Sequence, residues 1–404
     1  MSTGKYYKKD LRQYTSTIQE TTMLGVLSLV IFVAGSLASP NVGSAHKKYY
    51  KTHETIAEAG YPVETHDVVT PDGYILELVR IPRGKNDNGK VRPPVLMMHG
   101  LSDYGATYIA LGPKDSLAYN LVDEGADVWL ANARGVANSR RHITLDPDND
   151  RQKKDFFDFT FHEIGTIDLP ALIDYILKET GQKKLHYVGH SQGGTVFLVL
   201  NSMKPEYNDK IISAHLLAGV GYQSNFPNAA LRATALSVDM IFNFAIRSGL
   251  IELIGPNWGD QIAEIENQQT LSLGVDSRSS ILDDIINTEK LLPGASLKQY
   301  AHYGQNIRDK KFRQWNYGIQ NLRRYGQLSP PEYDLSKITA DVTMHYTLND
   351  NLLSERDVLN MAKVMAKVTV RKIARETFTH TDFVSADDAK ELVVDFIVKK
   401  IAGL

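Results

Sequence analysis

The sequence contains no cysteine among its 404 residues. This absence excludes disulfide bonds, thiolate catalysis, and zinc or iron–sulfur sites built on cysteine ligands. It does not identify a reducing compartment, because it removes only one marker of an oxidising one. An Asn-x-Ser/Thr glycosylation acceptor is also lacking, since Asn201-Ser202-Met203 and Asn287-Thr288-Glu289 have the wrong order.

The sequence also lacks an excess of charge of either sign, because its formal net charge is only −2. That balance gives no reason to expect a nucleic-acid partner. The pattern from Gly84 to Lys90 fits most of a phosphate-binding loop, but Val91 replaces the Mg²⁺-binding Ser/Thr, and Pro93-Pro94 follows where a helix is needed. We therefore interpret this stretch as a surface loop and expect no cofactor. The content of 43% apolar and 23% charged residues is that of a globular protein.

Long apolar runs are scarce, and the run over residues 23–37 is too short for a comfortable membrane span of about 20 residues. Its small C-terminal residues predict a secretory signal cleaved after Ala38. The basic residues lie well upstream of the apolar run, unlike those of an ordinary signal. Two alternatives to a cleaved signal that begins at Met1 are therefore translation from Met23 and a signal anchor. We expect a mature protein, secreted or in the lysosomal lumen, with no stable membrane span after signal removal.

One short stretch carries the clearest chemical signal. Leu185, Tyr187 and Val188 favour a strand, and an apolar helical segment begins near Thr195. Between them lies Gly189-His190-Ser191-Gln192-Gly193, a G-x-S-x-G sequence in the strand–turn–helix context of a nucleophile elbow. The bland alternative is a turn that happens to contain a serine. The flanking elements favour Ser191 as a nucleophile at the N-terminus of the next helix.

Strand and helix patterns alternate on both sides of this stretch. Residues 62–81 resemble a hairpin around Pro71-Asp72-Gly73. Further strands are predicted at residues 94–98, 127–130, 211–217, 342–347 and 368–370, with helices at 162–180, 354–365 and 389–401. Such alternation predicts an α/β protein with a mostly parallel sheet covered on both faces.

The alternation stops between about residues 221 and 328, where strand signals nearly vanish. One apolar helix is predicted over residues 229–246 and another near residues 281–286. The segment ends at Ser329-Pro330-Pro331. We interpret it as a helical insertion whose apolar face either packs on the core or faces the substrate.

A serine nucleophile needs a base, and the base needs an acid that fixes its tautomer. The chain order Ser, acid, His selects His380, the single histidine C-terminal to Asp350. Asp350 is the candidate acid because it directly follows a predicted strand, with Asp382 as the main rival. The plain alternative for His380 is an exposed loop histidine.

Two backbone N–H groups are required to stabilise the oxyanion. Gln192, which follows the nucleophile, is one candidate donor. The other is Leu101 in His99-Gly100-Leu101, at the end of an early predicted strand. The side chain of His99 is expected to be structural.

The sequence resembles the acid lipases of animals, which include the gastric and lysosomal lipases. The likeness runs from about residue 50 to the C-terminus. It is carried by Thr70-Pro71-Asp72-Gly73-Tyr74-Ile75-Leu76, His99-Gly100-Leu101, Asp127-Val128-Trp129-Leu130, Gly189-His190-Ser191-Gln192-Gly193, Pro330-Pro331-Glu332-Tyr333-Asp334, Asn349-Asp350 and His380 with Asp382-Phe383. The family's usual cysteines and glycosylation sites are missing here.

This resemblance implies an α/β-hydrolase fold and a lipase of neutral lipids, with Ser191, Asp350 and His380 as triad and Leu101 and Gln192 as oxyanion donors. It also implies a cap with a lid. The expected organisation is an N-terminal extension with the signal (1–45), hydrolase core (46–220), cap with lid (221–330) and hydrolase core (331–404). The expected partners are a lipid ester and the lipid–water interface. The alternatives are a soluble carboxylesterase and a non-catalytic lipid-binding protein.

Overall fold

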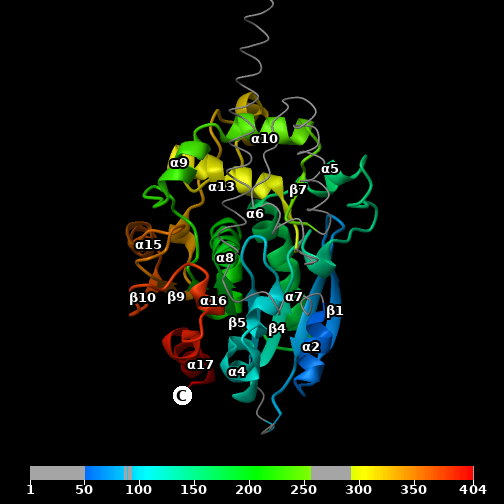
Figure 1. Ribbon diagram of the computed structural model, residues 1–404, viewed down its shortest axis with the longest axis vertical. Coiled ribbons are helices and arrows are strands. Elements are labelled where there is room, and N and C mark those ends of the chain that lie inside the picture. The colour runs from blue at the N-terminus through cyan, green and yellow to red at the C-terminus, as the bar shows by residue number, and fades with distance from the viewer. Residues whose placement is uncertain (1–50, 86–88, 90–92, 256–292, 404) are drawn as a thin grey trace, which may run out of the picture.

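The computed structural model of this chain describes residues 51–85, 89, 93–255 and 293–403. The predicted secretory signal at residues 23–37 lies outside the described residues. So does the helix expected near residues 281–286. In Figure 1 the central sheet occupies the lower part of the molecule, and helices α9, α10 and α13 lie above it.

The described residues form one eight-stranded sheet in the order β1-β2-β4-β3-β5-β6-β9-β10, beside a two-stranded ribbon β7-β8. Strand β2 is antiparallel to both of its neighbours, and all other pairs of the large sheet are parallel. This is the mostly parallel sheet that the sequence predicts. The strands are β1 (Glu64–Val69), β2 (Ile75–Ile81), β3 (Pro94–Met98), β4 (Asp127–Ala131), β5 (Leu185–His190), β6 (Ile211–Leu217), β7 (Glu252–Leu253), β8 (Ala295–Ser296), β9 (Asp341–Tyr346) and β10 (Lys367–Lys372).

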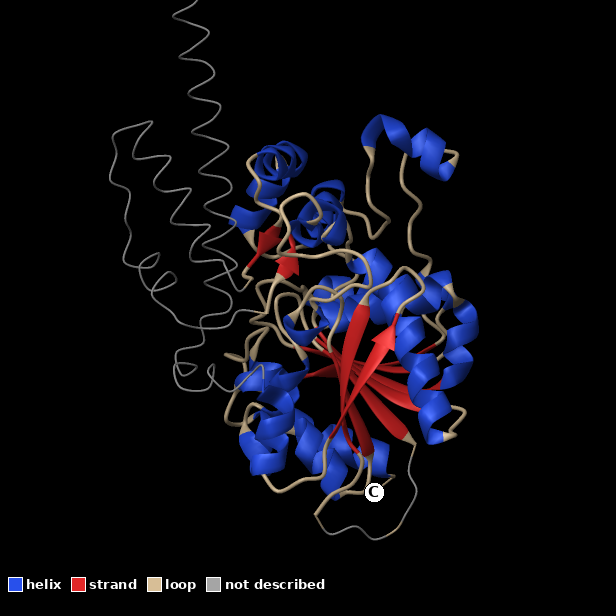
Figure 2. Ribbon diagram, turned by 90° about the vertical axis from the view of Figure 1, so that its right-hand side faces the viewer, coloured by secondary structure: helices blue, strands red, loops and turns tan. Residues whose placement is uncertain are grey.

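Helices connect the strands and cover the sheet on both sides (Figure 2). Helix α4 packs against α17, and α7 packs against α8. The α-helices are α2 (Thr52–Glu58), α3 (Gly112–Asp115), α4 (Leu117–Asp123), α5 (Lys153–Phe156), α6 (Phe161–Glu163), α7 (Leu169–Thr180), α8 (Gln192–Met203), α9 (Ala229–Ala235), α10 (Val238–Arg247), α13 (Leu297–Asp309), α14 (Asn321–Tyr325), α15 (Glu355–Ala362), α16 (Asp382–Ser385) and α17 (Asp395–Ala402).

The central strands are buried along their whole length. Every residue of β3 and of β5 is buried. A parallel strand with helices on both faces has no solvent side, so its side chains are buried without alternation; β3 is apolar throughout, and β5 includes the buried His186 and His190. This burial makes the strand ends rigid supports for the loops that follow them.

The loop after β4 is held by a buried cation. The guanidinium of Arg134 donates to Asp168 Oδ1 at 2.8 Å and to Asp72 Oδ2 at 2.7 Å, and it lies 4.0 Å from the ring centroid of Tyr74. Only 1% of Arg134 is exposed. Burying this charge is tolerable because two carboxylates and a ring face replace its hydration. The network ties the β1–β2 turn, the β4 loop and the segment before α7 together.

The segment between β6 and β9 differs from the sequence prediction in one respect. In place of one helix over residues 229–246, α9 and α10 meet at a bend of 68°. Both helices pack against α13, and Val238 clusters with Ala301 and Trp315. By length and hydropathy no single helix of the described residues could cross a membrane, and the bent pair passes that test only together.

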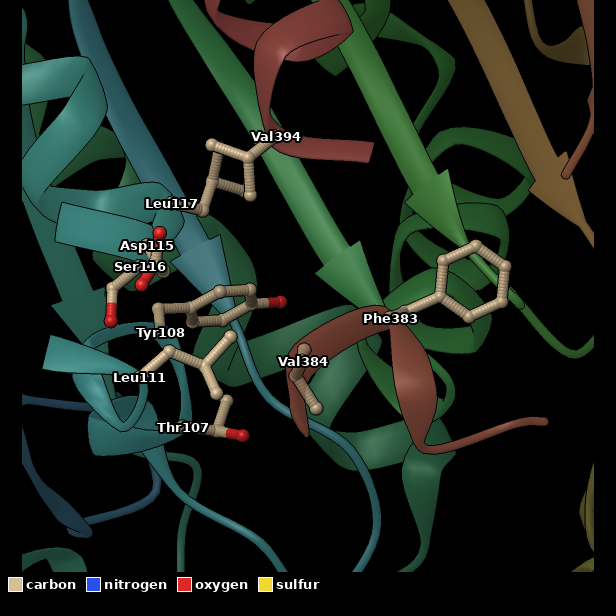
Figure 3. Close-up of a pocket in the computed structure, with 9 residues that line it drawn as sticks. All are labelled: Thr107, Tyr108, Leu111, Asp115, Ser116, Leu117, Phe383, Val384 and Val394. Atoms are coloured by element: carbon tan, nitrogen blue, oxygen red, sulfur yellow. The ribbon is translucent and has the colours of Figure 1, made fainter. Parts of the chain in front are cut away.

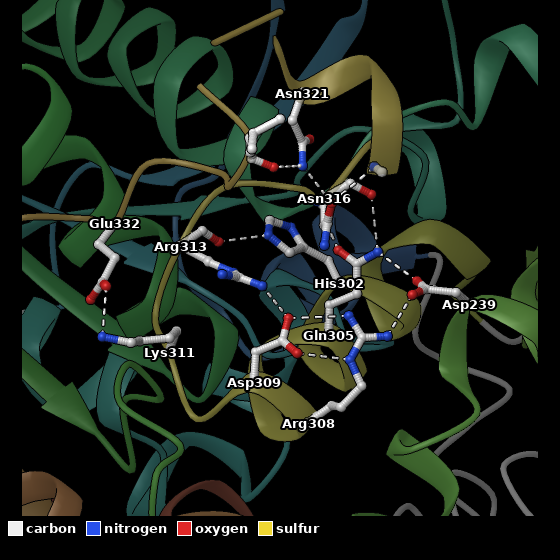
Figure 4. A network of polar contacts seen from close by, with 12 residues as sticks. Asp239, His302, Gln305, Arg308, Asp309, Lys311, Arg313, Asn316, Asn321 and Glu332 are labelled. Atoms are coloured by element: carbon white, nitrogen blue, oxygen red, sulfur yellow. Dashed lines mark hydrogen bonds and ion pairs between the residues drawn. The ribbon is translucent and has the colours of Figure 1, made fainter. Parts of the chain in front are cut away.

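Helix α13, which the sequence did not predict, is fixed by polar contacts (Figure 4). Gln305 Nε2 donates to Asp239 Oδ1 at 2.7 Å, and Arg308 pairs with the same carboxylate. His302 Nε2 donates to the backbone oxygen of Arg313 at 2.8 Å. These bonds lock α13 to α10 and to the chain that follows it.

Candidate active site

Ser191 lies at the sharp turn between β5 and α8. Its backbone has φ 50° and ψ −111°, a strained conformation for a residue with a side chain. The turn closes only because its neighbours are glycines: a Cβ on Gly193 would lie 2.2 Å from the Met98 oxygen, and one on Gly189 would lie 2.5 Å from the Gly193 carbonyl carbon. The Ser191 N–H donates to Leu217 O at 2.9 Å. The glycines on both sides of Ser191 therefore give the turn the space that it needs beside β3 and β6.

The structure brings Ser191, His380 and Asp350 into one hydrogen-bonded row. His380 Nε2 lies 2.8 Å from Ser191 Oγ, and His380 Nδ1 lies 2.7 Å from Asp350 Oδ2. The Asp350 side chain is 1% exposed and that of His380 is 7% exposed. With Nδ1–H donated to the carboxylate, Nε2 is free to accept the serine proton.

The loop after β9 directs Asp350 toward this row. Its Oδ1 accepts the N–H groups of Leu352 at 2.7 Å and Leu353 at 2.9 Å, which leaves Oδ2 for His380. The rival acid, Asp382, is occupied elsewhere: its carboxylate pairs with Arg375 and accepts the Thr379 N–H at 2.9 Å. The two acidic residues thus have separate partners.

The sequence reasoning missed two groups that support the row. His190 Nε2 donates to the backbone oxygen of His380 at 2.9 Å, and burial lowers the pKa of His190 to about 3, so its ring is neutral. Tyr108 donates to Met98 O at 2.8 Å and accepts the His190 N–H at 3.0 Å. Figure 3 shows Tyr108 in the same pocket as Phe383 of α16. His190 is adjacent to Ser191 in sequence, which is the one signal that pointed to it.

Leu101 lies in the loop after β3, and Gln192 is the first residue of α8, directly after Ser191. A Cβ on Gly100 would lie 3.3 Å from Ser191 Cβ, so the loop after β3 passes directly beside the nucleophile. Within the described residues, neither the Leu101 nor the Gln192 backbone N–H has a protein acceptor. His99 is structural, as expected: its Nε2 accepts the Ala133 N–H at 3.1 Å.

In residues 51–85, 89, 93–255 and 293–403, no three His, Asp or Glu side chains converge in a way that could hold a metal ion. The hydrogen-bonded row at Ser191 brings together a hydroxyl, an imidazole and a carboxylate, which are groups that acyl transfer uses.

Two family models match the chain. A model described as the partial alpha/beta-hydrolase lipase region matches residues 52–112, and one described as the alpha/beta hydrolase fold matches residues 93–374. Among solved structures, a membrane phospholipase A described as a bacterial virulence factor aligns with a TM-score of 0.50 and 14% identity, covering 95% of this chain and 100% of that one. That likeness supports the fold alone.

Curated relatives extend the match over most of the chain. Lipase 1 of Drosophila melanogaster is 37% identical over 351 residues, covering 84% of this chain and 76% of that protein. The gastric triacylglycerol lipase of Rattus norvegicus is 33% identical over 362 residues, covering 85% and 89%. The human gastric triacylglycerol lipase is 32% identical, covering 89% and 96%. The chain therefore belongs to the α/β-hydrolase family and, within it, to the lipases, which are carboxylic ester hydrolases.

Proposed function

We propose that Ser191, His380 and Asp350 hydrolyse lipid esters through an acyl-enzyme. His380 Nε2 takes the proton of Ser191 as its Oγ attacks the ester carbonyl, and the imidazolium then protonates the departing alcohol. Water, deprotonated by the same ring, hydrolyses the acyl-enzyme. The observation that carries the proposal is the unbroken hydrogen-bonded row of 2.8 Å and 2.7 Å from serine to histidine to carboxylate.

The developing negative oxygen is assigned to the backbone N–H groups of Leu101 and Gln192. Leu101 follows Gly100, which lies beside Ser191, and Gln192 follows Ser191 at the start of α8; neither N–H has a protein acceptor in the described residues. Loss of one such donor typically lowers the rate about 10²- to 10³-fold. The Asp350 carboxylate stabilises the imidazolium and fixes its tautomer, without itself taking the proton.

The proposed substrate class is a neutral lipid ester, triacylglycerol or sterol ester, met at a lipid–water interface. Two curated relatives named above are triacylglycerol lipases, which supports this choice. We propose that residues 46–220 and 331–404 form the hydrolase core and that residues 221–330 act as cap with lid. The exposed apolar side chains of Leu236 and Met240, on the α9–α10 pair, suit contact with lipid.

We infer that the mature protein is secreted, after cleavage near Ala38. The sequence from residue 23 to 38 supports this through its short apolar run and small C-terminal residues. N-terminal sequencing of the active protein is the test. A terminus near residue 39 is expected, and Met1 or Ser2 at the terminus of the active form would contradict the proposal.

The decisive experiment compares the wild type with Ser191→Ala and with Ser248→Ala, a matched control at an exposed serine. The substrates are emulsified triolein and a short-chain ester below and above its solubility limit. Reactivity of the serine is measured separately with a fluorophosphonate probe that labels it covalently. Ser191→Ala should lose turnover and labelling, while the control keeps both. Labelling of the Ser191→Ala variant by the probe would refute the assignment of Ser191 as the nucleophile. A rate that does not rise when the ester forms an interface would favour a soluble carboxylesterase.

A further inference from the structure

Two adjacent cap residues contact the loops that carry the two oxyanion donors. Gln192 Nε2 donates to Gln299 Oε1 at 2.8 Å, and the Tyr300 hydroxyl is hydrogen-bonded to Ser102 Oγ. Gln299 and Tyr300 belong to α13, a helix of the segment proposed as the cap. Gln192 is itself one donor, and Ser102 directly follows the other, Leu101.

One of the two contacts is made where the backbone is strained. Ser102 has φ 55°, in the left-handed region that a residue with a Cβ seldom adopts. It is 5% exposed, so its hydroxyl has no bulk water to bind in place of Tyr300. Gln299 is 1% exposed and Gln192 is 4% exposed, so their amide–amide bond is also shielded from water. Shielded hydrogen bonds of this kind hold backbone segments in one position.

Helix α13 is rigid enough to act as the reference for both loops. At its N-terminus Ser296 Oγ donates to Phe157 O at 2.6 Å and accepts the Lys298 N–H at 3.1 Å. About two turns further on, Tyr303 donates to Thr195 Oγ1 at 2.9 Å. Besides its contacts with Gln192 and Ser102, the first half of the helix is therefore fixed to the core at two places.

We infer that Gln299 and Tyr300 are positioning residues that set the separation of the two oxyanion donors, so that the docked cap completes the hole. The inference rests on the proposed function and adds to it a role for cap side chains in the chemical step. Neither residue touches the reacting atoms. Their effect passes through Gln192 and through the Ser102–Leu101 backbone.

The chain offers a matched control for each residue. Tyr300→Phe and Tyr303→Phe both remove a partly buried hydroxyl of α13 that binds a core hydroxyl, but only the first partner lies in an oxyanion loop. Gln299→Met and Gln305→Met both remove a buried amide of the same helix. Gln305 binds Asp239 and the backbone of Asn316, away from the serine (Figure 4).

Each variant is tested as the full-length enzyme on a soluble short-chain ester, which avoids effects of lipid binding. Measurements are kcat, KM, the rate constant of fluorophosphonate labelling and Tm. Misplacing a donor costs less than removing it, so Tyr300→Phe and Gln299→Met should each lower kcat and the labelling rate about ten-fold with KM unchanged. Because they act on different donors, the double variant should lose about a hundred-fold.

The control variants distinguish a positioning role of Gln299 and Tyr300 from a general loss of protein stability. Tyr303→Phe and Gln305→Met should lower Tm by amounts similar to those of their counterparts while kcat stays within about two-fold. Equal kcat losses in test and control variants, or no loss in either test variant, would overturn the inference. If Ser191→Ala stays active, the proposed function fails; if it is inactive while both test variants match the wild type, only the positioning role fails.

Discussion

Acid should unfold this protein in a pH range that its buried histidines define. Burial lowers the pKa of five histidine side chains from the ordinary value of 6.5 to about 3 or 4, because a charged ring would lose its hydration. They are His99, His186, His190, His215 and His302. In the unfolded chain these rings bind protons below pH 6.5, and in the folded chain they do not. The unfolded state therefore gains protons first as the pH falls, and stability decreases.

The size of the effect follows from proton linkage. For a ring with a folded pKa of about 3, each pH unit below 6.5 removes about 1.4 kcal/mol from the free energy of unfolding, or about 2 kcal/mol at pH 5. Asp103 opposes one such loss, because burial raises its pKa to about 7 and the folded state then binds its proton more tightly. Burial also raises the pKa values of Glu77, Asp127 and Asp168, which act in the same sense as Asp103. Because five histidines act together, we expect a net loss of stability at pH 5, against about 5–15 kcal/mol for a typical domain.

Urea unfolding from pH 8 to pH 4.5, followed by circular dichroism, measures this directly. We expect the free energy of unfolding to fall steeply below pH 6.5. In the wild type His186 Nδ1 is hydrogen-bonded to Ser213 Oγ at 2.8 Å. The variant His186→Gln should reduce the slope of the free energy against pH by about one proton. His53→Gln, at an exposed position of α2, is the matched control and should leave the slope unchanged. A free energy of unfolding that is flat between pH 7 and pH 5 would refute the reasoning.

Three further changes test the site and its supports. Asp350→Asn should lower kcat about 10⁴-fold with little change in Tm, because the imidazole loses its fixed tautomer; a loss below ten-fold would argue against its role. Gly193→Ala should abolish fluorophosphonate labelling, since the new Cβ meets the Met98 oxygen at 2.2 Å, and normal labelling would show that the elbow has room. Arg134→Met should lower the free energy of unfolding in urea by about 3–5 kcal/mol, because the buried Asp168 loses its cationic partner and keeps only the backbone N–H of residue 134; a loss under 1 kcal/mol would contradict this.

The sequence alone was sufficient for features that depend on neighbouring residues. The elbow at Ser191 is predicted by Gly189, Gly193 and Gly194, which lie within two or three positions of it. The continuous apolar run of β3 predicted a buried strand, and Leu185, Tyr187 and Val188 predicted β5, because parallel strands covered on both faces have no solvent side. Chain order then selected His380 as the one histidine beyond Asp350, without any knowledge of distances.

Only the tertiary structure decided which distant groups meet. Helices α9 and α10 meet at a bend and both pack on α13, a helix with no clear signal in its own sequence. His380 is hydrogen-bonded to Asp350, whereas Asp382 pairs with Arg375 and accepts the Thr379 N–H. Such contacts join residues far apart in the chain, and no periodicity within a segment encodes which partner a side chain finds once the layers pack.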